Sequence, residues 1–87
     1  YPREVEEVLY EHPHVLEAAV VGTPDEHYGQ TVTAVITPLP GTALTAEEIE
    51  AFCRERLAAY KIPRIIRFVE ALPKGPTGKI RKRDIPL

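Results

Sequence analysis

The sequence predicts an α+β fold, with a small three-stranded mixed sheet covered by helices, and three observations lead to this prediction. Two short apolar segments, residues 15–22 and 31–37, have the length and composition of β-strands. A helix with an N-terminal capping box follows them at Thr45. A third strand-like segment, residues 65–69, comes after that helix. The predicted order of elements is therefore α-β-β-α-β, followed by a C-terminal lysine loop.

The first helix is expected over residues 2–12. Pro2 suits the first turn of a helix, because the N–H that it lacks would have no partner there. Acidic residues complement the positive end of the helix, and apolar residues recur on one face: Glu4, Glu6 and Glu7, with Val5, Val8 and Leu9. Pro13 ends the helix.

The next two segments are predicted to be neighbouring strands. Residues 15–22 are almost continuously apolar, which is typical of a buried strand, and residues 23–25 close it with a turn signal. After a loop that contains His27, residues 31–37 are rich in β-branched side chains, and Pro38 stands at their end. We expect the two strands to pair antiparallel.

The second helix is predicted from the capping box Thr45-Ala46-Glu47-Glu48. Apolar residues then recur at helical spacing: Ile49, Phe52, Cys53 and Leu57. Because this helix joins residues 31–37 to residues 65–69, it forms a βαβ crossover, which predicts parallel pairing and a right-handed connection. The residues after Leu72 are expected to be a tail outside the core.

The composition predicts a single domain over residues 1–87, without a large internal cavity. With 11 basic and 13 acidic residues and a net charge of −2, the chain lacks polyanion-binding character, and no nucleic-acid partner is expected. The single cysteine, Cys53, and the absence of a long apolar run fit a soluble cytoplasmic protein with no transmembrane segment. The opening residues lack a signal-peptide pattern, and the chain looks cut at its start.

Residues 73–83 form the stretch that most invites a functional interpretation, because a lysine stands among prolines and glycines. A phosphate-binding P-loop needs four residues between its glycines and a serine or threonine after the lysine. Here two residues separate Gly75 from Gly78, and Ile80 follows Lys79. Two interpretations of this stretch stay open. It is either an arm that places one positive charge in a site built by another domain or protein, or a solvated tail rich in turn residues.

The other polar side chains give weaker signals. Three histidines, His12, His14 and His27, lack spaced carboxylate or cysteine partners, so no metal site is predicted. The glutamates of the first helix fit a charge bias at its N-terminal end, not an acid–base pair. Arg54 and Arg56 would suit a phosphate, although arginines on helix faces are usually solvated. Cys53 is given no chemistry.

Five segments in order resemble the small C-terminal domain of acyl-CoA synthetases, members of the adenylate-forming superfamily. They are Tyr1-Pro2-Arg3-Glu4-Val5-Glu6, His12-Pro13, Ala18 to Asp25, Tyr60-Lys61-Ile62-Pro63, and Leu72-Pro73 with Pro76-Thr77-Gly78-Lys79-Ile80. The resemblance implies that Lys79 reaches into the active site of a larger N-terminal domain, which binds ATP and Mg²⁺ and is absent from these residues. There Lys79 would stabilise the charge that develops during adenylation, with Gly78 and Thr77 shaping the arm.

The resemblance also implies a second half-reaction, in which this domain rotates and CoA attacks the acyl-adenylate. Arg54 occupies the position of a basic residue that lies near the CoA nucleotide phosphate in acetyl-CoA synthetases. A fatty or similar carboxylic acid is the expected substrate, the 87-residue chain alone is expected to be inactive, and Lys79 has the sequence context of a lysine that acetyltransferases modify.

Two rival functions stay open at this point. One is the C-terminal part of a peptide-synthetase adenylation domain, in which a carrier protein replaces CoA as acceptor. The other is a stand-alone module whose basic tail, residues 79–83, docks an anionic partner.

Overall fold

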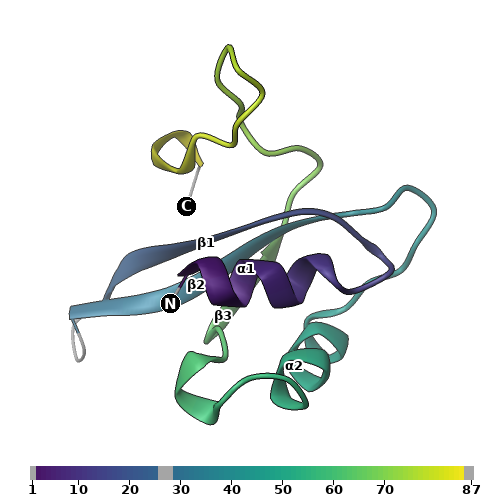
Figure 1. The fold of residues 1–87 in the computed structure, drawn as a ribbon, viewed down its shortest axis with the longest axis vertical. Coiled ribbons are helices and arrows are strands. Elements are labelled where there is room, and N and C mark those ends of the chain that lie inside the picture. The colour runs from purple at the N-terminus through teal and green to yellow at the C-terminus, as the bar shows by residue number, and fades with distance from the viewer. Residues whose placement is uncertain (1, 26–28, 86–87) are drawn as a thin grey trace.

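The computed structural model describes residues 2–25 and 29–85, which form two layers of helix and sheet with a C-terminal lobe (Figure 1). The helices are α1 (Pro2–Tyr10) and α2 (Ala46–Arg54), and the strands are β1 (Val15–Asp25), β2 (Gly29–Pro38) and β3 (Ile65–Phe68). Two short 3₁₀ turns, η1 (Ala59–Lys61) and η2 (Lys82–Asp84), complete the described chain. The predicted α+β fold with a three-stranded mixed sheet is confirmed.

The sheet has the order β1-β2-β3, so β2 lies in the centre. β1 pairs antiparallel with β2, and β2 pairs parallel with β3, as the sequence predicts. The first two strands are longer than predicted, because Thr23 pairs with Thr31 and Asp25 with Gly29. Pro24 is tolerated inside β1 because an edge strand does not need every N–H for the ladder.

Helix α1 ends at Tyr10, two residues earlier than predicted. The N–H groups of Glu11 and His12 donate to carbonyls only three residues back, Val8 and Leu9, so the chain tightens into a turn before Pro13. Helix α2 begins as predicted, since the Thr45 hydroxyl accepts the Glu48 N–H at 3.2 Å. The predicted right-handed crossover stays a prediction.

The main core lies on the face of the sheet that the two helices cover. Its buried members are Val5, Val8, Leu9, Val15, Ala18, Val20, Ala34, Ile36, Ile49, Cys53 and Leu57. A register shift between Val15 and Glu17 lets Val15 and Ala18 face the same side, although their spacing is odd. The helical stripes predicted from the sequence therefore meet the sheet at this face.

A second apolar cluster lies on the opposite face and corrects the expectation of a C-terminal tail. Ala19 and Val35 contribute to it, and these residues alternate along β1 and β2 with members of the main core. Leu72 and Ile85, which are 5% and 6% exposed, pack against them. Residues 72–85 are therefore anchored to the sheet at both ends, because the face would otherwise leave apolar side chains in water.

No helix in the described part of the chain is long and apolar enough to cross a membrane. His27 lies outside the described residues.

Candidate functional site: the lysine hairpin

Residues 73–81 form a small β-hairpin, called here the lysine hairpin. The Arg81 N–H donates to the Pro73 carbonyl at 2.8 Å, and the Gly75 N–H donates to the Lys79 carbonyl at 2.8 Å. Between these bonds, Lys74 and Ile80 form an antiparallel bridge. The prolines and glycines of this stretch thus belong to a hydrogen-bonded structure and not to an irregular tail.

The tip of the lysine hairpin explains its turn residues. The Gly78 N–H donates to the Gly75 carbonyl at 3.0 Å, which closes a turn with Pro76 and Thr77 at its centre. Proline suits the first central position because its φ is already fixed. Gly78 has φ of +83°, the left-handed conformation that ends a three-residue hairpin loop and that glycine adopts without strain.

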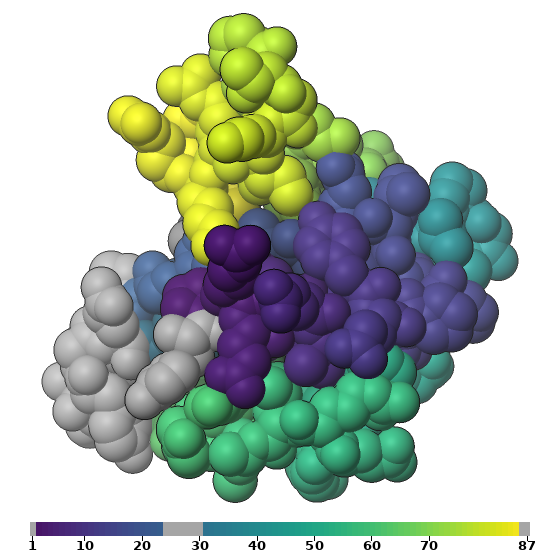
Figure 2. Space-filling model, in the orientation of Figure 1, coloured from purple at the N-terminus to yellow at the C-terminus, as the bar shows by residue number. Residues whose placement is uncertain are grey.

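Lys79 follows this tip directly, and its side chain is exposed. Three basic neighbours in the same segment have carboxylate partners: Lys74 with Glu17, Arg81 with Asp84, and Lys82 with Glu6. Within residues 2–25 and 29–85, no ion pair or hydrogen bond involves the Lys79 ammonium group. Lys79 therefore presents an uncompensated positive charge, on a lobe that rises from the rest of the molecule (Figure 2).

The other residues assigned to the arm, Gly78 and Thr77, are both exposed at the tip. Their positions are explained by the turn itself, since Gly78 supplies the left-handed residue and Thr77 the second central position. The sequence predicts that Thr77, Gly78 and Lys79 act together, and in the structure Thr77 and Gly78 belong to the turn that Lys79 directly follows.

Arg54 lies elsewhere, at the last residue of α2. Its guanidinium group forms an ion pair with Glu50 one turn earlier, and about half of each side chain or more is exposed. Arg54 lines an open surface hollow of about 530 Å³ together with Glu50 and Arg64. Two guanidinium groups at one hollow suit an anionic ligand, and Glu50 offsets part of their charge.

Arg54 and the lysine hairpin lie on opposite sides of the sheet. Helix α2 contributes Ile49 and Cys53 to the main core, whereas the segment with Lys79 is anchored by the second cluster. Figure 1 shows the sheet between α2 and the lobe that contains the lysine hairpin. One site cannot use both residues at once, so any roles they have belong to different surfaces of the domain.

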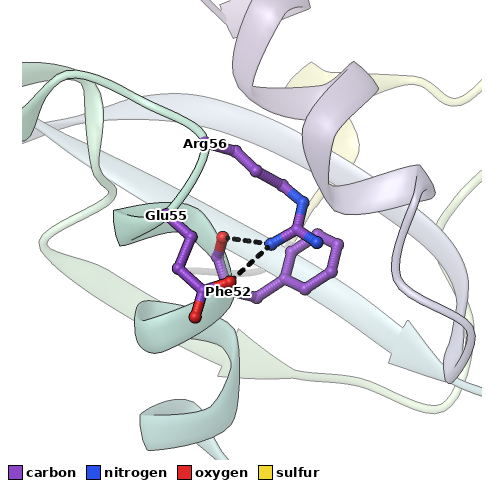
Figure 3. Close-up of polar contacts among 3 residues, drawn as sticks. All are labelled: Phe52, Glu55 and Arg56. Carbon is purple, nitrogen blue, oxygen red and sulfur yellow. Dashed lines mark hydrogen bonds and ion pairs between the residues drawn. The ribbon is translucent and has the colours of Figure 1, made fainter.

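Arg56 is occupied by a local structural role. Its guanidinium carbon lies 3.6 Å from the centre of the Phe52 ring, and Nη1 donates to the Phe52 carbonyl at 3.1 Å and pairs with Glu55 at 3.4 Å (Figure 3). The His12 ring contacts the same phenyl ring edge-on, with centroids 4.8 Å apart. Phe52 therefore joins α2 to the turn after α1, and Arg56 packs over the Phe52 ring.

His12 is held in its neutral form by this packing. Burial lowers the pKa of His12 below its ordinary value of 6.5, and the nearby His14 and Arg56 add to the effect while Glu48 opposes it. The Nδ1 atom accepts the His14 N–H at 3.0 Å, which requires an unprotonated nitrogen there. No group of three metal-ligating side chains occurs among the residues that the structure describes.

Cys53 is fully buried in the main core, and burial raises the pKa of its thiol while Arg56 opposes the shift. A protonated and inaccessible thiol is a poor nucleophile.

Two carboxylates that sequence reasoning did not connect to the lysine hairpin are Glu6 and Glu17. The position of Glu17 within a strand of apolar residues was the one sequence feature that could have indicated an ion pair, because a charged side chain in a buried strand needs a partner.

Comparison with known proteins gives a consistent result. The model of the family described as AMP-binding enzyme C-terminal domain matches residues 4–79. The long-chain-fatty-acid–CoA ligase of Bacillus subtilis (strain 168) is 48% identical over 85 residues, which are 98% of this chain and 15% of that protein.

Two solved structures show how closely the fold agrees. A fatty acyl CoA synthetase of Mycobacterium tuberculosis matches with a TM-score of 0.89 at 41% identity, over 95% of this chain and 16% of that chain. The amide bond synthetase McbA of Marinactinospora thermotolerans matches with a TM-score of 0.88 at 41% identity, over 95% of this chain and 17% of that one. The chain thus spans only about a sixth of the length of such proteins.

Proposed function

The chain belongs to the family of AMP-binding enzyme C-terminal domains, and on this premise we propose that it is the mobile C-terminal domain of an ATP-dependent acyl-CoA synthetase. The enzyme would activate a carboxylic acid, of the fatty-acid type, as acyl-AMP and then transfer the acyl group to CoA. The observation that carries the proposal is Lys79, an exposed cation that has no carboxylate partner within residues 2–25 and 29–85, at the last residue that the family match covers.

In the first half-reaction, a carboxylate oxygen of the acid would attack the α-phosphorus of ATP, and pyrophosphate would leave. Negative charge increases on the oxygens around that phosphorus during the attack. Lys79 would be delivered there by the lysine hairpin and would stabilise the charge in a site closed to water. The site itself, including the binding of Mg²⁺ with ATP, would be built mainly by a larger N-terminal domain.

In the second half-reaction, the CoA thiol would lose its proton and attack the acyl carbonyl carbon, and AMP would leave. Arg54, with Arg64 beside it at the open hollow, fits the chemistry of a CoA nucleotide phosphate. Because Arg54 and Lys79 lie on opposite sides of the sheet, rotation of the domain between the two steps would bring each to the active site in turn. Gly78 and Thr77 would act in the first step only, as parts of the arm.

The acceptor of the acyl group needs its own test, since one similar solved structure is named an amide bond synthetase. Two segments, Tyr60-Lys61-Ile62-Pro63 and Pro76-Thr77-Gly78-Lys79, resemble the CoA ligases more than the peptide-synthetase domains, and this resemblance favours CoA over a carrier protein as the acceptor. Purified acyl-adenylate should be offered to the full-length enzyme with CoA, or with a pantetheinylated carrier protein. Thioester formation with CoA alone supports the proposal, and transfer to the carrier protein alone refutes it.

The role of Lys79 is tested by comparing wild type with Lys79→Ala in the full-length enzyme. ATP–pyrophosphate exchange with a panel of carboxylic acids should fall about 10²- to 10³-fold, as when other charge-stabilising donors are removed. Thioester formation from supplied acyl-adenylate should be preserved. Normal exchange by the variant would show that the resemblance has assigned the wrong residue, and the binding of an anionic partner by the basic segment would then be the better interpretation.

A lysine acetyltransferase is a proposed regulatory partner, because Lys79 is exposed and forms no ion pair with the residues that the structure describes. Acetylation would remove the charge that adenylation needs and would leave the second half-reaction intact. Mass spectrometry of the full-length enzyme after incubation with an acetyltransferase tests this, and an unmodified Lys79 would refute it.

A further inference from the structure

The lysine hairpin is fastened to the body of the domain by one ion pair on each side. On the incoming strand, Nζ of Lys74 lies 2.6 Å from Oε2 of Glu17 in β1. Just after the outgoing strand, Nζ of Lys82 lies 2.9 Å from Oε2 of Glu6 in α1. The hairpin and the residue that follows it, Lys82, therefore contact two different elements, β1 and α1, through two carboxylates.

Both carboxylates are largely covered, which separates them from ordinary surface pairs. The side chains of Glu17 and Glu6 are 20% and 19% exposed. In the pair between Arg3 and Glu7, by contrast, the two side chains are 93% and 69% exposed. The lysine side chains, Lys74 and Lys82, are 45% and 44% exposed, so each pair is covered mainly at its carboxylate. Solvent and salt still screen these two pairs less than the more exposed pair of Arg3 with Glu7.

Glu6 is also fixed in direction. Its Oε2 atom accepts the backbone N–H of Val20 at 2.8 Å, in addition to facing Lys82. A carboxylate with two partners has little freedom to rotate. It therefore offers Lys82 a rigid attachment point on the edge of the sheet.

The distribution of partners leaves the functional lysine free. Glu17 and Glu6 neutralise the lysines on either side, while the Lys79 ammonium has no carboxylate partner in the described part of the chain. The same contacts add two attachment points to those that the burial of Leu72 and Ile85 provides. The basic segment is thus divided into anchoring lysines and one lysine available to a ligand.

We propose that Glu17 and Glu6 are positioning residues for Lys79: by holding Lys74 and Lys82, they fix the lysine hairpin in the orientation that delivers the Lys79 ammonium to the adenylation site. The inference rests on the adenylation role of Lys79 proposed above. The physical reason is preorganisation, because a charge that must first be ordered stabilises a transition state less than one already in place.

The test uses Glu17→Gln and Glu6→Gln in the full-length enzyme. Glutamine keeps the volume of the side chain, and its amide oxygen can still accept the Val20 N–H, so that mainly the ion pair is lost. Hydrogen exchange at the amides of Gly75, Gly78 and Arg81 should accelerate about two- to fivefold in each variant. ATP–pyrophosphate exchange should slow by a similar factor, and the double variant should lose roughly the product of the two factors.

Three comparisons distinguish positioning from a general loss of stability. Thioester formation from supplied acyl-adenylate should stay at the wild-type rate, whereas a damaged fold would lower both half-reactions. Glu7→Gln, which removes an exposed pair on the same helix, should leave both half-reactions and the hairpin exchange unchanged. The reversed pair, Glu17→Lys with Lys74→Glu, should recover part of the adenylation rate that Glu17→Lys alone loses.

The failure of this inference can be told from the failure of the proposed function. If Lys79→Ala abolishes adenylation while Glu17→Gln and Glu6→Gln adenylate normally, the two carboxylates are not positioning residues, whatever their effect on hydrogen exchange. If adenylation and thioester formation fall together in the glutamine variants, their role is structural and the inference is wrong. If Lys79→Ala itself adenylates normally, the proposed function of Lys79 fails first, and the positioning role falls with it.

Discussion

Replacing Gly78 by alanine should weaken the lysine hairpin through backbone strain alone. Gly78 has φ of +83°, and a Cβ atom at this position would meet no atom within 4 Å. Alanine would not clash there, but the left-handed conformation costs an L-residue about 1–2 kcal/mol. The lower entropy of alanine in the unfolded chain offsets about 0.4–1 kcal/mol. The net loss of hairpin stability is expected to be about 1 kcal/mol.

Gly41 provides a matched control, because it has the same φ of +83° and equally open surroundings, in the turn between β2 and α2. Urea unfolding of the 87-residue chain should show a loss of no more than about 1 kcal/mol for either alanine variant. ATP–pyrophosphate exchange by the full-length enzyme should fall up to about fivefold for Gly78→Ala, since this is the rate equivalent of 1 kcal/mol. It should be unchanged for Gly41→Ala.

A third variant, Gly78→Asn, tests the cause directly. Asparagine adopts the left-handed conformation more readily than alanine, so Gly78→Asn should recover part of the lost exchange rate. The reasoning is refuted if asparagine is no better than alanine, or if Gly41→Ala slows adenylation as much as Gly78→Ala does.

Two further predictions concern the main core and its border. The folded state holds the pKa of His12 below the ordinary 6.5, so the unfolded chain binds the proton more readily. The contribution of His12 to the free energy of unfolding should therefore be complete above about pH 6.5 and should be lost as the pH falls through the lowered folded-state pKa. In His12→Asn, the free energy of unfolding measured with urea should depend less on pH over this range. An unchanged pH dependence would show that His12 is not its cause. Cys53, fully buried and with a raised pKa, should react with iodoacetamide only as fast as the chain unfolds, and peptide mass spectrometry showing rapid labelling of the native protein would contradict its burial.

The elements predicted correctly are those specified by local signals. The capping box at Thr45 acts within one turn of helix, and the β-branched residues 31–37 favour a strand wherever the chain lies. The mixed pairing follows from the order of the elements, since a helix between two strands favours a parallel crossover. The prolines and glycines around Gly78 also mark a turn in the sequence. The ion pairs of the neighbouring Lys74 and Lys82 with Glu17 and Glu6 could not be predicted, because these partners are distant in the sequence.

The C-terminal segment was beyond such reasoning because its structure depends on distant partners. The residues between Leu72 and Ile85 are mostly polar, proline and glycine residues, so no periodicity marks these two side chains as buried. Their burial follows from the far side of the sheet, where Ala19 and Val35 need cover that neither helix provides. A strand that is apolar at almost every position, such as residues 15–22, is the signal that both faces are covered.

The hydrogen bond from Val20 to Glu6 also bears on how the chain behaves at high concentration. β1 is an edge strand, and the N–H groups along such an edge can recruit a strand from another molecule. The Glu6 carboxylate occupies one of these donors at 2.8 Å and places a negative charge over it. Pro24, further along the same strand, has no N–H to offer. The residue that anchors the lysine hairpin therefore also protects this edge against intermolecular sheet extension, and truncating it to alanine would expose the edge to aggregation.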